Sequence, residues 1–178
     1  MRLWALVAAP ILLSFERVFY IRVWRNPDWF RSFCNARLIA QLRDPVTAVR
    51  SAFYVFKGVQ LAVFCGWCYA FGAGERGYIS AQAPAVALAG ILILTGQILN
   101  FGVFLRLGRV GVFYGDIFGH ELPRCQQFPF SVLNHPQYVG ALLSVWGFFL
   151  LTRYPNLDWL YLPLVETAYY ALGAYFEQ

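Results

Sequence analysis

Residues 84–107 read PAVALAGILILTGQILNFGVFLRL, and this stretch decides the class of fold. Within its 24 residues the only charged side chain is Arg106, close to the end. About 20 mainly apolar residues are enough for a helix to cross the hydrocarbon core of a bilayer. The proline at position 84 suits the first turn of a helix. The stretch therefore predicts a transmembrane helix.

The rest of the chain is equally apolar. Hydrophobic residues make up 60% of the sequence, charged residues make up 13%, and the mean hydropathy is +0.53. Soluble domains contain roughly 45–50% apolar and about 25% charged residues, so this composition excludes that class. Four further apolar segments are Leu3–Val23, Ala48–Phe71, Gln137–Leu151 and Leu157–Phe176. We predict an all-α, polytopic bundle of four to five transmembrane spans, forming a single domain over residues 1–178, without the internal repeat typical of transporters.

The net charge of +5 is carried almost wholly by arginine, and the arginines are unevenly placed. Seven lie on and between the first two spans and three lie around the loop after the third span, whereas the opposite side holds only three. The positive-inside rule then places loops one and three, and the C-terminal tail, in the cytosol. Because these arginines adjoin apolar spans, we expect contact with the lipid bilayer and none with nucleic acid. Residues 26–42 mix aromatic and basic side chains, which favours a helix lying in the membrane interface.

Several polar side chains interrupt the apolar spans, where they are costly and usually face protein or a cavity. They are Glu16, Arg17, Lys57, Gln60, Thr95, Gln97, Asn100 and Glu166. One interpretation is internal pairing, for example of Glu166 with Lys57, which would hold the bundle together. The other is a polar cavity open to cytosol and lipid. No metal-ligand spacing is present, so no metal is expected.

The C-terminal half carries the most specific motifs. Residues 111–119 read GVFYGDIFG, residues 128–140 read FPFSVLNHPQYVG, and the chain ends AYFEQ. The combination GxFxGDxFG, FPF, HPxYxG and a terminal Glu resembles the phospholipid N-methyltransferase family. The N-terminal SFERVFYIRVWRNPDWF is similar to the first span and loop of its bacterial and fungal members. The resemblance implies methylation of phosphatidylethanolamine derivatives towards phosphatidylcholine, with S-adenosyl-L-methionine as cofactor.

The resemblance also implies cofactor residues, because the family pattern has Gly-x-Gly in the third span and a Glu pair after the last. In this sequence Leu94-Thr95-Gly96 and Glu177-Gln178 occupy these places, so Gly96 and Glu177 match while Leu94 and Gln178 depart from the pattern. Gly96 would let the adenosine approach a helix backbone closely.

The start of the fourth span is itself suited to binding an anion. We expect Asn134 to cap the helix, with His135 and Pro136 following, so that free N–H groups and His135 meet the cofactor carboxylate. Tyr138 and Gly140 lie one turn into the span and would form a wall of the pocket. Glu177 would meet the ammonium or sulfonium on the same face of the membrane.

The remaining predicted roles concern the lipid substrate. Arg106, Arg109 and Arg124 are expected to contact the lipid phosphate at the depth of the head group. Candidate proton acceptors for the attacking amine are Asp116, His120 and Glu166.

Two alternative functions stay open at this point. One is an isoprenylcysteine carboxyl methyltransferase-like enzyme, which would share HPxYxG but not GDxFG and FPF; the other is a non-catalytic lipid-binding membrane protein. The expected location is the endoplasmic reticulum membrane in a eukaryote or the inner membrane in a bacterium. The sequence leaves the oligomeric state undetermined.

Overall fold

The computed structural model describes residues 3–36, 43–72, 82–122 and 125–177, and within these ranges the regular secondary structure is helical, without any strand. The all-α prediction is therefore confirmed for them. The helices are α1 (Leu3–Arg25), α2 (Pro27–Asn35), α3 (Pro45–Gly72), α4 (Ala83–Val112), α5 (Pro136–Thr152), the 3-10 turn η2 (Leu157–Leu160) and α6 (Tyr161–Phe176).

Three of the helices, α1, α3 and α4, are long and apolar enough to cross a membrane. Helix α5 is a shorter apolar helix of 17 residues, which corresponds to about 25 Å. Helix α6 has 16 residues and continues from η2. The membrane class of the prediction is thus supported, while the count of four to five spans stays a prediction.

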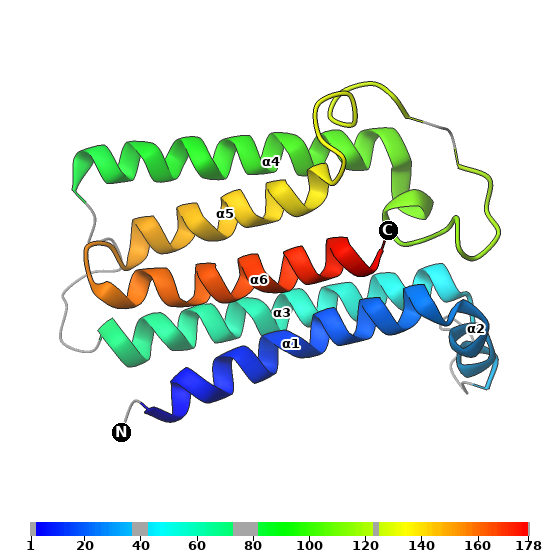
Figure 1. Ribbon diagram of the computed structural model, residues 1–178, viewed down its shortest axis with the longest axis horizontal. Coiled ribbons are helices and arrows are strands. Elements are labelled where there is room, and N and C mark those ends of the chain that lie inside the picture. The colour runs from blue at the N-terminus through cyan, green and yellow to red at the C-terminus, as the bar shows by residue number, and fades with distance from the viewer. Residues whose placement is uncertain (1–2, 37–42, 73–81, 123–124, 178) are drawn as a thin grey trace.

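The long helices lie side by side in one bundle (Figure 1). Neighbouring helices pack as the pairs α4–α5, α5–α6, α6–α1 and α1–α3. Among the described helices, α4 packs extensively on α5 alone. The end of α6 lies at the same end of the bundle as the start of α5 and the end of α1, whereas the N-terminus lies at the opposite end.

Helices α4 and α5 approach closely because glycines face each other across their contact. A Cβ atom added to Gly96 would lie 2.4 Å from the Gly140 carbonyl oxygen, and one added to Gly140 would lie 2.7 Å from the Gly96 carbonyl oxygen. A third glycine, Gly147, lies against the Ala89 carbonyl in the same way. Small residues at a helix contact let backbones pack tightly in a membrane. This contact fixes the depth and rotation of α5.

We expect Gly96→Ala to destabilise the fold by about 1–3 kcal/mol, because the added methyl group has no room. Gly90→Ala is the matched control, since a Cβ at Gly90 of the same helix would meet nothing within 4 Å. Thermal unfolding in detergent micelles measures the difference. Equal midpoints for the two variants would contradict this packing.

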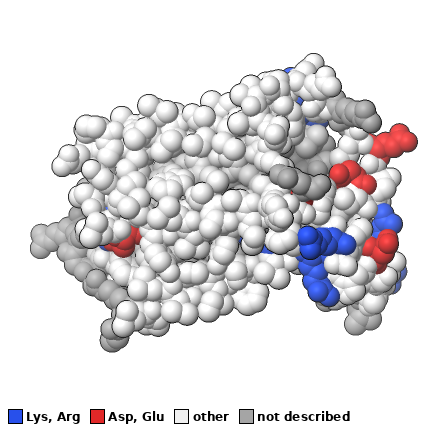
Figure 2. Space-filling model, viewed as in Figure 1, with Lys and Arg blue, Asp and Glu red and all other residues white. Residues whose placement is uncertain are grey.

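Most charged side chains on the visible face gather at the end of the bundle where α2 lies, and the long middle of that face carries almost none (Figure 2). At this end Arg31 of α2 donates a hydrogen bond of 3.2 Å to the Ile117 carbonyl, which joins loops one and three. The two loops predicted to share a membrane side therefore meet. Helix α2 falls within the predicted interfacial segment, of which residues 37–42 lie outside the described residues; its position in an interface stays a prediction.

At the same end Asp44 caps the first turn of α3. Its carboxylate accepts hydrogen bonds from the Thr47 N–H at 2.9 Å and the Thr47 hydroxyl at 2.6 Å. Partial burial opposes the charged form, but these hydrogen bonds outweigh it and lower the pKa of Asp44. The cap is therefore at full strength in neutral solution.

Asp44→Ala is expected to cost about 1 kcal/mol of stability at neutral pH through the lost cap. Because the folded-state pKa is depressed, this contribution is present above the ordinary aspartate pKa of about 4 and is lost as the pH falls through the folded value. The difference in thermal midpoint between wild type and variant should therefore shrink in acid. A difference that is independent of pH would contradict a role for the charged carboxylate.

Candidate active site

A cavity of about 550 Å³ opens inside the bundle near its charged end. Side chains of α1, α3, α4 and α5 form its walls, together with Tyr170 of α6, Glu177 and the segment after α4. Ligand pockets in proteins are typically about 300–1,000 Å³, so the space suits one small molecule or part of a larger one.

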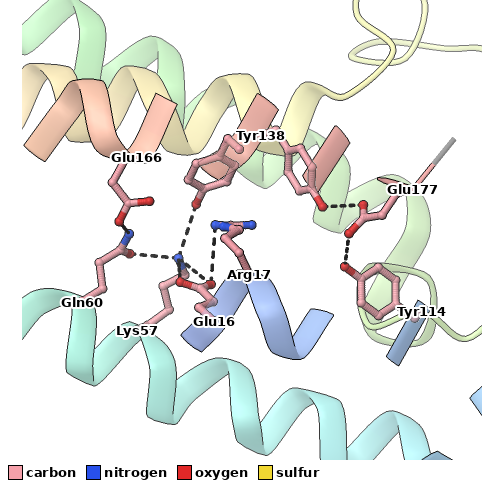
Figure 3. Close-up of polar contacts among 9 residues, drawn as sticks. Glu16, Arg17, Lys57, Gln60, Tyr114, Tyr138, Glu166 and Glu177 are labelled. Carbon is pink, nitrogen blue, oxygen red and sulfur yellow. Dashed lines mark hydrogen bonds and ion pairs between the residues drawn. The ribbon is translucent and has the colours of Figure 1, made fainter. Parts of the chain in front are cut away.

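Glu177 lines this cavity. Two tyrosines hold its carboxylate (Figure 3). The Tyr114 hydroxyl donates to Oε1 at 2.7 Å, and the Tyr138 hydroxyl donates to Oε2 in a short hydrogen bond. Both tyrosines also line the cavity. A carboxylate that accepts hydrogen bonds from two neutral donors still has free lone pairs for a cation.

Tyr114 reaches this position because the chain bends sharply near the end of α4 and again just after it. Gly108 has a φ of +61°, which breaks the helix and suits a residue without Cβ, and Tyr114 itself has a φ of +61°. Burial raises the pKa of Tyr114 well above its ordinary value, and Tyr138 and Glu177 add to the effect. Tyr114 is therefore a hydroxyl donor at neutral pH. Sequence reasoning did not single it out, although it lies inside the quoted GxFxGDxFG motif.

The start of α5 meets the end of α6, as predicted, but the cap is one residue later than expected. His135 is the N-cap residue and Pro136 the first helical residue, so the assignment of Asn134 as the cap is wrong. Asn134 is exposed and does not line the cavity. His135 does line it, with its ring stacked on Tyr138 at 5.7 Å between centroids.

A charged network forms the wall opposite Glu177 (Figure 3). Lys57 lies 3.1 Å from the Glu16 carboxylate and donates to the Gln60 oxygen at 2.9 Å, and Gln60 donates to Glu166 at 2.5 Å. Glu166 is thus linked to Lys57 through Gln60. The polar residues of the spans thus pair with one another and also face a cavity. Six of them line it: Glu16, Arg17, Lys57, Gln60, Gln97 and Asn100. The opening of this cavity to cytosol and lipid stays a prediction.

The structure leaves several predicted site residues out of the cavity lining. Asp116 and His120 are exposed, and Glu166 is buried behind Gln60. Arg106 and Arg109 are exposed and donate to the Phe128 carbonyl at 3.3 Å and the Thr47 hydroxyl at 3.5 Å. Gly96 and Gly140 pack against each other and do not line the cavity. Arg124 and Gln178 lie outside the described residues.

The cavity has unmet hydrogen-bonding capacity that a cofactor could use. Among the described residues, three buried polar atoms on its walls have no hydrogen-bond partner: Asn100 Oδ1, the Tyr20 hydroxyl and Arg17 Nε. Buried polar groups in folded proteins are nearly always satisfied, so such atoms call for a ligand or ordered water. Donors, an acceptor and the Glu177 carboxylate together fit a zwitterionic cofactor that also bears a sulfonium.

Helices long and apolar enough to cross a membrane, with a charged cavity at one end of their bundle, define the class of membrane proteins with an internal polar site. The sequence model of the phospholipid methyltransferase family matches residues 84–178, so the chain belongs to this family. It is an enzyme of phospholipid methylation.

Its relatives include the phosphatidyl-N-methylethanolamine N-methyltransferase of Arabidopsis thaliana, 32% identical over 140 residues that cover 79% of this chain and 74% of the relative. The phosphatidyl-N-methylethanolamine N-methyltransferase of Schizosaccharomyces pombe is 35% identical over 51% of this chain and 46% of its own length. Human phosphatidylethanolamine N-methyltransferase is 33% identical over 43% of this chain and 40% of its own length. The matches to the last two thus cover less than half of the relatives' lengths. No solved structure is significantly similar to the chain.

Proposed function

We propose that this protein transfers methyl groups from S-adenosyl-L-methionine to the amine of phosphatidylethanolamine derivatives, namely phosphatidyl-N-methylethanolamine and its dimethyl form, to give phosphatidylcholine. The observation that carries the proposal is the position of the Glu177 carboxylate, which Tyr114 and Tyr138 hold at the cavity wall, where it could meet a cation. Family membership supplies the class of reaction. The names of the Arabidopsis and S. pombe relatives support the choice of substrates.

The cofactor residues follow from this geometry. Glu177 would pair with the positive end of the cofactor, while His135 and the free N–H groups at the start of α5 would hold its carboxylate. When bound, the cofactor supplies an electrophilic methyl group on sulfur. The protein contributes position and exclusion of water, and holding two reactants in line can lower the barrier by roughly 7–11 kcal/mol.

The substrate amine must be neutral to attack, so a group near the cavity has to accept its proton. Of the three predicted acceptors, Glu166 alone contacts a cavity-lining side chain, that of Gln60. Glu166 is thus the proposed acceptor. The Gln60 side chain lies between it and the cavity and would have to move aside for the proton to reach the carboxylate.

The cavity lies at the arginine-rich end of the bundle, which supports a site facing the cytosol. The membrane would be the endoplasmic reticulum in a eukaryote or the inner membrane in a bacterium.

Radiolabelled methyl transfer tests the proposal. Purified protein in detergent is given S-adenosyl-L-methionine labelled in the methyl group and nanodiscs of phosphatidylcholine that hold phosphatidylethanolamine, its monomethyl form or its dimethyl form. Label in the lipid fraction, with the methylated forms used efficiently, is the expected result. A parallel reaction contains a prenylcysteine peptide in place of the lipids. Label in the peptide but in none of the lipids would show the isoprenylcysteine alternative, and label in neither would show a non-catalytic protein.

A further inference from the structure

Arg17 is a buried arginine in the wall of the cavity, contributed by α1. Only 4% of the residue is exposed, yet it lines the cavity and its Nε has no hydrogen-bond partner among the described residues. Helix α1 lies outside residues 84–178, which the family description matches. The part of the chain that builds this wall therefore lies outside the family match.

The guanidinium group is held rigidly by aromatic rings and by its neighbour on the helix. It lies 3.6 Å from the centre of the Tyr170 ring and 5.6 Å from that of Tyr138. One of its terminal nitrogens lies 3.8 Å from the Glu16 carboxylate. Stacking on aromatic faces fixes a guanidinium plane without using its N–H groups, so Nε–H stays available to an acceptor.

The charge of this wall also favours an anion. Its lining holds two cations, Arg17 and Lys57, which share the single carboxylate of Glu16. The other nearby carboxylate, Glu166, does not line the cavity and is bonded to Gln60. Glu166 offsets the two cations only from behind Gln60, so an anion in the cavity would meet Arg17 and Lys57 at closer range than Glu166.

We infer that Arg17 is a ligand-binding residue that donates through Nε–H to an anionic oxygen of a bound reactant. The oxygen belongs either to the carboxylate of the cofactor or to the phosphodiester of the lipid, which offer the same chemistry. Arg17 would take the place of the exposed Arg106 and Arg109 if the phosphodiester is its partner. The inference rests on the proposed function.

The test compares Arg17→Gln and Arg17→Lys with the matched control Arg22→Gln, an exposed arginine on the same helix. Two constants are measured for each protein: the Kd of S-adenosylhomocysteine by calorimetry, and the KM of phosphatidyl-N-methylethanolamine in nanodiscs. Loss of a charge-assisted hydrogen bond should raise one constant about tenfold or more in Arg17→Gln. Arg17→Lys keeps the charge but loses the fixed N–H, and should be intermediate. A rise in Kd assigns the carboxylate, and a rise in KM assigns the phosphodiester.

If the Arg17 variants fail to fold, a variant with the opposite expected effect on the binding constant still tests the inference. Glu16→Gln removes the carboxylate shared by the two cations, so the same constant should fall below the wild-type value. Both constants within about twofold of wild type in every variant that folds would overturn the inference. Wild-type protein that binds S-adenosylhomocysteine but methylates no lipid would instead overturn the proposed function and leave the Kd comparison valid.

Discussion

Replacing Glu177 with glutamine is expected to lower kcat/KM for methyl transfer about 30- to 100-fold, mainly by weakening cofactor binding. The substitution keeps the size of the side chain and an oxygen for one tyrosine, but removes the charge that Tyr114 and Tyr138 hold in the cavity. A hydrogen bond or ion pair to a charged group is worth roughly 1.5–3 kcal/mol, and 1.4 kcal/mol corresponds to a factor of ten. Titration with S-adenosylhomocysteine and steady-state kinetics measure the two parts of the effect.

Glu121→Gln is the matched control for this experiment, because Glu121 is exposed and does not line the cavity. It should leave both constants at their wild-type values. Tyr138→Phe removes one of the two donors to Glu177 and should give a smaller loss than Glu177→Gln. Normal cofactor affinity in Glu177→Gln would show that the carboxylate does not contact the cofactor, and the site would have to be placed elsewhere in the cavity.

The largest expected effect on stability is that of Lys57→Met. Lys57 is the nearest cation to Glu16, whose side chain is only 6% exposed, and the remaining cation, Arg17, lies farther away at 3.8 Å. Removing one partner of a buried ion pair typically costs about 3–5 kcal/mol, since it leaves the other charge uncompensated. Denaturation by SDS in mixed micelles should show a loss near the lower end of this range, because Arg17 remains.

A second substitution tests the cause of that loss. In the double variant Lys57→Met/Glu16→Gln the buried carboxylate is gone as well, so most of the lost stability should return. Losses that simply add would mean that Lys57 acts through packing rather than through Glu16.

The sequence predicts the helical spans well because composition and length alone determine whether a segment suits hydrocarbon. The predicted segment Gln137–Leu151 corresponds to α5 (Pro136–Thr152), and the predicted Leu157–Phe176 to η2 and α6. The meeting of His135, Tyr138 and Glu177 was also foreseen, since their motifs lie at the two ends of a pair of adjacent spans.

Which polar residues face the cavity was harder to predict, because that depends on the rotation of each helix against its partners. Asp116 and His120 stand in a sharp turn that exposes them, while Tyr114 in the same motif turns inward. Gly96 faces α5 because Gly140 faces it in return, and this pairing of small residues is visible only once both helices are placed. The role of Arg17 likewise depends on Tyr170, which is distant in sequence.

The restricted packing of α4 has an energetic consequence for a substrate with two long tails. Residues that line the cavity and are also exposed include Tyr54 and Leu61 on α3 and Phe104 on α4. A head group that entered sideways between these two helices would leave its fatty chains in the bilayer. Pulling them into water would cost about 0.8 kcal/mol for each methylene, or on the order of 20 kcal/mol for two chains. With such a route the enzyme would not have to extract the lipid from the membrane.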